Sequence, residues 1–193
     1  MNALTSNYKN IFYPPGGILV LMIVMLELTT FGMALIGLTY YSTLEPELFH
    51  TSRLHLNPAI GAINTVVLLL SGYFMAMAVH SFKKQEIQKT SKFMKLALLG
   101  GGVFLLIKSL EYYTKIEAGL TLDKNLFFTF YWLLTGFHLL HVLVGIVILF
   151  VIHRNMMKKN VQTPLEDVEA GAAFWHMCDL IWLLLFPSLY LIL

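Results

Sequence analysis

Apolar residues along this chain gather into five long runs, separated by short polar links. The first run begins after a polar segment that ends at Pro14–Gly17, and the second begins at Asn57–Pro58. A helix needs about 20 apolar residues to cross a bilayer, and each run approaches or exceeds that length. The sequence therefore predicts an all-α integral membrane bundle of five transmembrane helices, at about 17–39, 59–80, 96–113, 127–152 and 173–193.

The links between these runs are too short to fold as separate domains. The longest cover about 41–58 and 153–172. We therefore expect residues 1–193 to form a single transmembrane domain. The first apolar run is too long for the core of a signal peptide, so no cleavable signal peptide is predicted.

The composition agrees with a membrane protein. Hydrophobic residues make up 58% of the chain and charged residues only 12%, whereas about a quarter of a typical soluble domain is charged. The net charge of +2 gives no reason to expect a nucleic-acid partner. The single cysteine, Cys178, excludes a disulfide within the chain.

Basic residues are distributed unevenly between the two sides of the predicted bundle. Three lie on one side (Arg53, Lys115 and Lys124), and nine on the other: Lys9, Lys83, Lys84, Lys89, Lys92, Lys95, Arg154, Lys158 and Lys159. Cytoplasmic loops carry the excess of lysine and arginine. We therefore expect a cytoplasmic N-terminus and a periplasmic C-terminus.

One carboxylate, Glu27, falls near the middle of the first span. An ionised carboxylate at the bilayer centre costs about 2.5–3.5 kcal/mol on insertion scales. Two interpretations stay open. Glu27 is either a protonatable site that faces a proton path, a lipid or a ligand cleft, or a protonated side chain that hydrogen-bonds a neighbouring helix.

Two further polar pairs lie in the last two spans. His138 and His141 are three residues apart, as are His176 and Asp179, in which the carboxylate can orient the imidazole. Zinc sites on a helix favour a spacing of four, and no two histidines at matched depth suit axial haem ligation. We therefore expect no metal, cofactor or catalytic site in this chain, and interpret these side chains as hydrogen-bonding groups between helices.

Three charged residues lie at the end of the third span. Lys108, Glu111 and Lys115 follow one another at intervals of three and four residues, so Glu111 can meet either lysine on the helix surface. The sequence predicts a local ion pair near the outer end of the span, with long side chains reaching toward the interface. A contact with a partner subunit is the alternative.

Both C-terminal motifs resemble those of one known family. Residues 135–145 resemble the T-G-F-H-x-x-H-V-x-x-G signature of haem-copper oxidase subunit III, the cytochrome c oxidase subunit III family. Residues 175–182 resemble its W-H-F-x-D-x-x-W signature. Glu27 sits where the family carries a reactive membrane carboxylate. The resemblance covers about 17–193, and five spans match the short bacterial form. Longer members have two further N-terminal helices beside a lipid-filled cleft.

The resemblance implies a non-catalytic core subunit III of a bacterial respiratory oxidase, in the cytoplasmic (inner) membrane. Such a cytochrome c oxidase transfers electrons from cytochrome c to oxygen and translocates protons, with its haems and copper in partner subunits. Subunit I would be the direct partner, beside subunit II, the other oxidase subunits and phospholipids; membership of a respiratory supercomplex stays open. Glu27 would be protonatable and lipid-facing, and the helices would be joined by a polar network of Glu111, His138, His141, His176 and Asp179.

Other interpretations keep or change the fold. An accessory subunit of nitric oxide reductase, or subunit III of a quinol oxidase, would share the five-helix form. A small proton-linked transporter could use Glu27 and Asp179, although the sequence shows neither an inverted repeat nor a broken helix at mid-span. Val79, Cys178 and Pro187 depart from the common family pattern.

Overall fold

The computed structural model describes residues 14, 16–158 and 163–192. Within these ranges the chain is helical and has no strand. Its elements are α1 (Gly17–Leu44), α2 (Pro46–Arg53), α3 (Pro58–Lys83), α4 (Ile87–Glu117), α5 (Leu126–Met156), α6 (Leu165–Pro187) and the π-helix η2 (Ser188–Ile192). Five spans are long and apolar enough to cross a membrane: α1, α3, α4, α5 and α6 with η2. The predicted all-α bundle of five membrane helices is confirmed.

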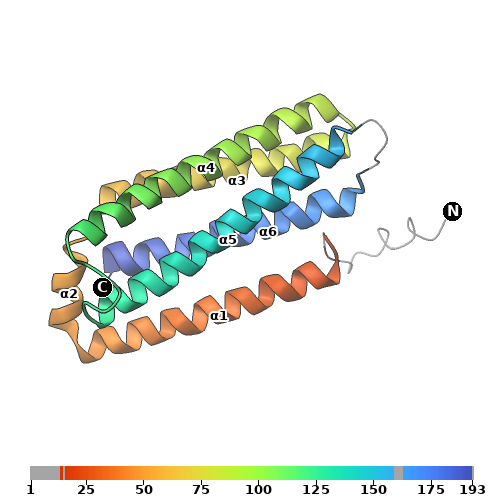
Figure 1. Ribbon diagram of the computed structural model, residues 1–193. Coiled ribbons are helices and arrows are strands. Elements are labelled where there is room, and N and C mark those ends of the chain that lie inside the picture. Colours follow the sequence, from red (N-terminus) through yellow and green to blue (C-terminus); the bar gives the residue numbers. More distant parts are fainter. Residues whose placement is uncertain (1–13, 15, 159–162, 193) are drawn as a thin grey trace.

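The helices pack in layers around α6. Helix α6 contacts α3, α5 and α1, while α4 pairs with α3 and also touches α5 (Figure 1). Helix α1 runs along the outside of the bundle, and buries only Gly17, Phe31 and Leu38 of its 28 residues. Most of the α1 surface therefore faces the bilayer or a partner protein.

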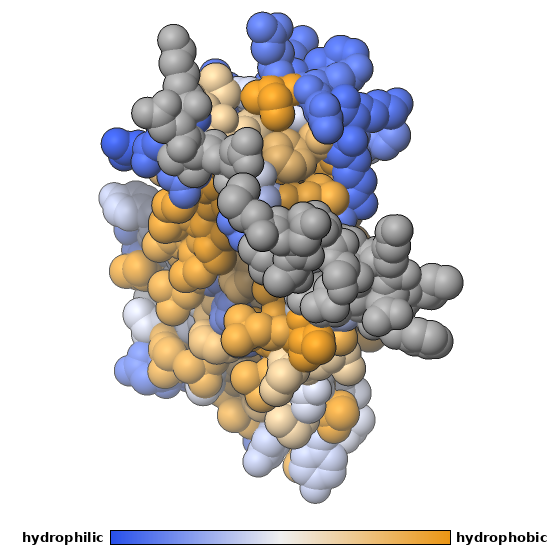
Figure 2. Space-filling model, turned by 90° about the vertical axis from the view of Figure 1, so that its right-hand side faces the viewer, coloured by the Kyte–Doolittle hydropathy of each residue, from blue (hydrophilic) through white to orange (hydrophobic). Residues whose placement is uncertain are grey.

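The two ends of the bundle differ in charge. The α3–α4 turn lies at the same end as the start of α1, and α2 and the C-terminus lie at the other (Figure 1). We call the first the basic end, because its described segments carry Lys83, Lys84, Lys89, Lys92, Lys95, Arg154 and Lys158. Figure 2 looks onto this end and shows hydrophilic residues gathered where α3 and α4 meet. The orientation of this end toward the cytoplasm stays a prediction.

Several helix boundaries differ from those expected. The third span starts at Ile87 rather than 96, and the fifth at Leu165 rather than 173. Both helices continue through polar residues beyond the hydrocarbon, where hydropathy no longer marks them. The link at 41–58 holds the short helix α2, which has Pro46 at its first position and Glu47 in its first turn. Both residues favour a helix start.

Local chemistry sets the ends of the other helices. The Asn57 side chain caps α3 by accepting hydrogen bonds from the backbone N–H groups of Ala59 and Ile60, at 3.0 and 3.3 Å. At the C-terminus the helix changes from α to π directly after Pro187. Proline lacks the N–H that an α-helix interior needs, and the π-helical turn absorbs the break.

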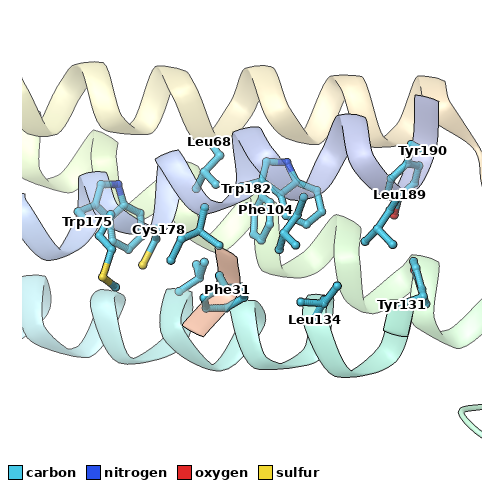
Figure 3. Close-up of a cluster of buried hydrophobic side chains, with 14 of the residues drawn as sticks. Phe31, Leu68, Phe104, Tyr131, Leu134, Trp175, Cys178, Trp182, Leu189 and Tyr190 are labelled. Carbon is cyan, nitrogen blue, oxygen red and sulfur yellow. The ribbon is translucent and has the colours of Figure 1, made fainter. Parts of the chain in front are cut away.

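Small residues let α6 approach its neighbours closely. The Trp175 ring packs directly against Gly101 and Gly145. A Cβ added at Gly101 would lie 2.5 Å from this ring, and a Cβ added at Gly145 would lie 2.8 Å from it. Its indole N–H donates to Ser71 Oγ at 3.2 Å. Figure 3 shows Trp175 in the buried core that also contains Trp182 and Phe104. Close packing of this kind is a principal source of helix association in membranes.

Candidate polar sites inside the bundle

A buried ion pair lies toward the α2 end of α4. Lys108 Nζ is 3.0 Å from Glu111 Oε2, and the two residues are only 1% and 6% exposed. The hydroxyl groups of Tyr131 and Tyr190 donate to Glu111 Oε1 at 2.9 and 2.6 Å. Lys108 Nζ donates to the Tyr190 hydroxyl at 2.6 Å. These four residues, named here the Lys108 cluster, tie α4 to α5 and η2.

The predicted ion pair is present, but the predicted reach of its lysine toward the interface is wrong. The ammonium of Lys108 stays inside the bundle because aromatic rings surround it. It lies 4.9–5.3 Å from the ring centroids of Tyr112, Tyr131, Trp182 and Tyr190. Cation–π attraction stabilises a desolvated cation at such distances. Lys115 makes a separate contact, a hydrogen bond to the His55 carbonyl.

Glu27 meets His141 across α1 and α5. Its Oε2 is 3.2 Å from His141 Nε2, and the side chains are 17% and 13% exposed. The approach is not aligned for a direct hydrogen bond. The other ring nitrogen of His141 faces the Phe137 carbonyl at 2.8 Å. Glu27 is thus mostly covered, and links the outer helix to the bundle.

His138 occupies a different environment from His141. It is fully buried, and neither ring nitrogen has a hydrogen-bond partner among the described residues. Its ring stacks on Trp182 with centroids 5.2 Å apart, and meets Phe104 edge-on at 5.7 Å. In this structure His138 therefore packs as a ring and joins no hydrogen-bond network.

The third pair lies on the face that α6 shares with α3. His176 Nδ1 is 3.2 Å from Asp179 Oδ2, with side chains 45% and 9% exposed. Gly72 of α3 lies so close to this carboxylate that a Cβ added at Gly72 would collide with it. Both residues line a groove between α3 and α6.

The structure thus divides the predicted residues among separate places. Glu111 belongs to the Lys108 cluster, Glu27 pairs with His141, and His176 pairs with Asp179, while His138 stands among aromatic rings. Sequence reasoning did not assign four contacts that join distant segments: Tyr131 with Glu111, Tyr190 with Glu111, Ser91 with His153 at 2.9 Å, and Lys83 with Glu169 at 2.7 Å. The partners in these contacts are 20 or more residues apart in the sequence, so no local spacing would have predicted them.

The part of the chain that the structure describes contains no candidate metal site. No three His, Cys, Asp or Glu side chains there come together in a group that could hold a metal ion. Among the predicted residues, Glu27 with His141 and the Lys108 cluster link different helices, whereas His176 and Asp179 pair within α6.

Comparison with known proteins gives a consistent pattern. The family model for cytochrome c oxidase subunit III matches residues 15–192. Three similar proteins are each named "Cytochrome c oxidase subunit 3". The protein from Pelomedusa subrufa is 33% identical over 159 residues, which are 78% of this chain and 60% of that protein. The protein from Heterololigo bleekeri is 32% identical over 142 residues, covering 71% and 54%.

A bacterial relative, from Corynebacterium diphtheriae, is 28% identical over 140 residues, covering 72% of this chain and 68% of that protein. The chain thus matches between about half and two thirds of the length of these curated relatives.

Proposed function

Because this chain belongs to the cytochrome c oxidase subunit III family, we propose that it is a non-catalytic core subunit of a bacterial respiratory haem-copper oxidase. The observation that carries the proposal is the family match over residues 15–192, together with a bacterial relative of that name. The complex would use electrons from cytochrome c to reduce oxygen and would translocate protons. Subunit I would be the direct partner of this chain, in the cytoplasmic membrane.

We propose that the haems and copper lie in the partner subunits. Three of the described histidines inside the spans contact a polar side chain of this chain: His141 contacts Glu27, His176 contacts Asp179 and His153 contacts Ser91. His138 is enclosed by aromatic rings. These arrangements support a role in which the chain stabilises the catalytic subunit by contact.

Phospholipid binding is the second part of the proposed role. Helix α1 turns large apolar side chains outward: Ile18, Leu19, Met22, Met25, Leu26, Met33 and Ile36. The basic end adds lysines at the depth of the headgroups, and basic residues attract anionic lipids at the cytoplasmic surface. We propose that the apolar side chains of α1 contact lipid tails and that the basic residues at the ends of α3, α4 and α5 contact phosphate groups.

Removal of this chain tests the proposal. Oxidase would be purified from cells that lack the chain, and from the same cells complemented with it. We expect equal haem and copper content per catalytic subunit and similar initial oxygen consumption. We also expect earlier loss of activity during sustained turnover when the chain is absent. A proportional loss of haem or copper from the complex would refute a non-catalytic role.

A further inference from the structure

Three unpaired cations lie at the basic end, on α4 and α5. Two other lysines of this end, Lys83 and Lys89, already pair with carboxylates. Lys92, Lys95 and Arg154 are exposed, and no described carboxylate pairs with them. Helix α5 contains no aspartate or glutamate, and the half of α4 at this end contains none either. These three cations therefore receive no counter-charge from their own helices.

The three cations project from the same side of the seam between α4 and α5. Ser91 and His153 meet across this seam, with Ser91 Oγ 2.9 Å from His153 Nε2. The two helices run in opposite directions (Figure 1), so the residues that follow them, Lys92 and Arg154, turn to the same side. Lys95 lies three residues after Lys92 and shares its face, and its charge interacts with the His153 ring. We call Lys92, Lys95 and Arg154 the seam cations.

An apolar surface continues from the seam cations toward the middle of the bundle. On α4, Leu99 follows Lys95 by four residues, and on α5, Phe150 and Val147 precede Arg154 by four and seven residues. These spacings place the side chains on the same helix faces as the cations, and all three are exposed. We call Leu99, Phe150 and Val147 the apolar strip. The seam cations lie where the uncharged stretches of α4 and α5 end, and the apolar strip lies within those stretches.

We propose that an anionic phospholipid binds this α4–α5 face, with its phosphate group on the seam cations and its acyl chains along the apolar strip. The inference rests on the phospholipid binding proposed above, and names one site and one class of headgroup for it. Lysine and arginine near a membrane surface attract anionic lipids. A zwitterionic headgroup would bring a positive charge to a place where like charges repel it and no carboxylate receives it. A free anion would use the seam cations but not the apolar strip.

Photo-crosslinking within the whole complex identifies the bound lipid. The complex would be placed in nanodiscs of phosphatidylcholine with a minor fraction of phosphatidylglycerol. The photoreactive residue p-benzoylphenylalanine would replace Phe150, or, as the control, the exposed Met22 of α1, a helix without lysine or arginine. One or two cations at a membrane surface should enrich phosphatidylglycerol among the Phe150 adducts by about 5- to 30-fold over the Met22 adducts. Equal lipid proportions at the two positions, or crosslinking of Phe150 to protein alone, would overturn the inference.

Charge variants test whether the seam cations cause the enrichment. Lys95→Gln/Arg154→Gln should abolish most of the enrichment at Phe150, whereas Lys95→Arg/Arg154→Lys should retain it because both charges remain. Lys84→Gln/Lys89→Gln removes the same charge from the same end of the bundle but outside the seam. Because salt screens more distant charges, this control should change the enrichment by less than about twofold. Full enrichment in Lys95→Gln/Arg154→Gln would overturn the inference.

A headgroup without acyl chains separates a lipid site from an anion site. Excess glycerophosphoglycerol should leave the enrichment at Phe150 unchanged, and its loss would overturn the lipid assignment. Thermal unfolding of each purified variant shows whether the variant is folded. Absence of lipid adducts from both Phe150 and Met22 would refute the proposed phospholipid binding itself, whereas adducts at both positions without enrichment would refute this site alone.

Discussion

Replacement of Glu111 by leucine is expected to destabilise the bundle by about 3–5 kcal/mol, because it leaves a buried cation without its partner. Lys108 is 1% exposed, and its ammonium lies 3.0 Å from the carboxylate that would be lost. The change also removes the acceptor of the Tyr131 and Tyr190 hydroxyls, at 2.9 and 2.6 Å. Hydrogen bonds to charged groups contribute about 1.5–3 kcal/mol each. Their sum overstates the loss, because Lys108 keeps the Tyr190 hydroxyl at 2.6 Å.

The double variant Lys108→Met/Glu111→Leu is the matched control. When both members of a buried pair become apolar, stability often changes little, so we expect the double variant to recover most of the loss. Unfolding of the purified chain would be titrated with SDS in mixed micelles and followed by tryptophan fluorescence, since Trp182 lies beside Lys108. A loss below about 1 kcal/mol in Glu111→Leu would contradict the magnitude expected for a broken buried pair. So would a double variant that is at least as unstable as the single one.

Three further predictions follow from contacts elsewhere in the chain. Gly101→Ala should lower stability by about 1–3 kcal/mol through overpacking against Trp175, while Gly102→Ala, which has open space around its Cβ, should be neutral or slightly stabilising in the same titration. A hydrophobic carbodiimide should label the wild-type chain at Glu27, as mass spectrometry would show, and equal labelling of Glu27→Gln would exclude this carboxyl as the reactive one. Asn57→Ala should cost about 1 kcal/mol through loss of the α3 cap, and unchanged stability would show that the cap contributes nothing.

The number and type of spans could be predicted from the sequence because the bilayer imposes a strict length and polarity on each helix. The helix boundaries could not be predicted in this way. Ile87 and Leu165 begin helices in segments that are too polar for a hydropathy pattern to mark. Helix α2 depends on local signals at Pro46 and Glu47, which a search for apolar runs does not detect.

Candidate polar residues were visible in the sequence, but their partners were not. His138 and His141 lie one turn apart, yet His138 stacks on Trp182 while His141 faces Glu27. Spacing along one helix gives the direction of a side chain, and only the packing of the helices decides what it meets. Tyr190 joins Glu111 for the same reason, since the π-helical turn brings it beside α4.

Pairs within one helix could be predicted better than contacts between helices. Lys108 with Glu111 and His176 with Asp179 are each three residues apart, and both appear as contacts. Their burial could not be foreseen. Four aromatic rings cover Lys108, whereas His176 is left on an open groove. The same local spacing therefore produces a buried cluster in one place and a partly exposed pair at a groove in another.

The most direct test of the proposed oxidase role is purification of a tagged copy of this chain from native membranes in mild detergent. The reduced-minus-oxidised spectrum and the identities of the co-purifying chains would be recorded together. We predict haem a bands with oxidase subunits I and II. Haem b bands with a nitric oxide reductase, or a colourless protein that purifies alone, would contradict the assignment to a cytochrome c oxidase.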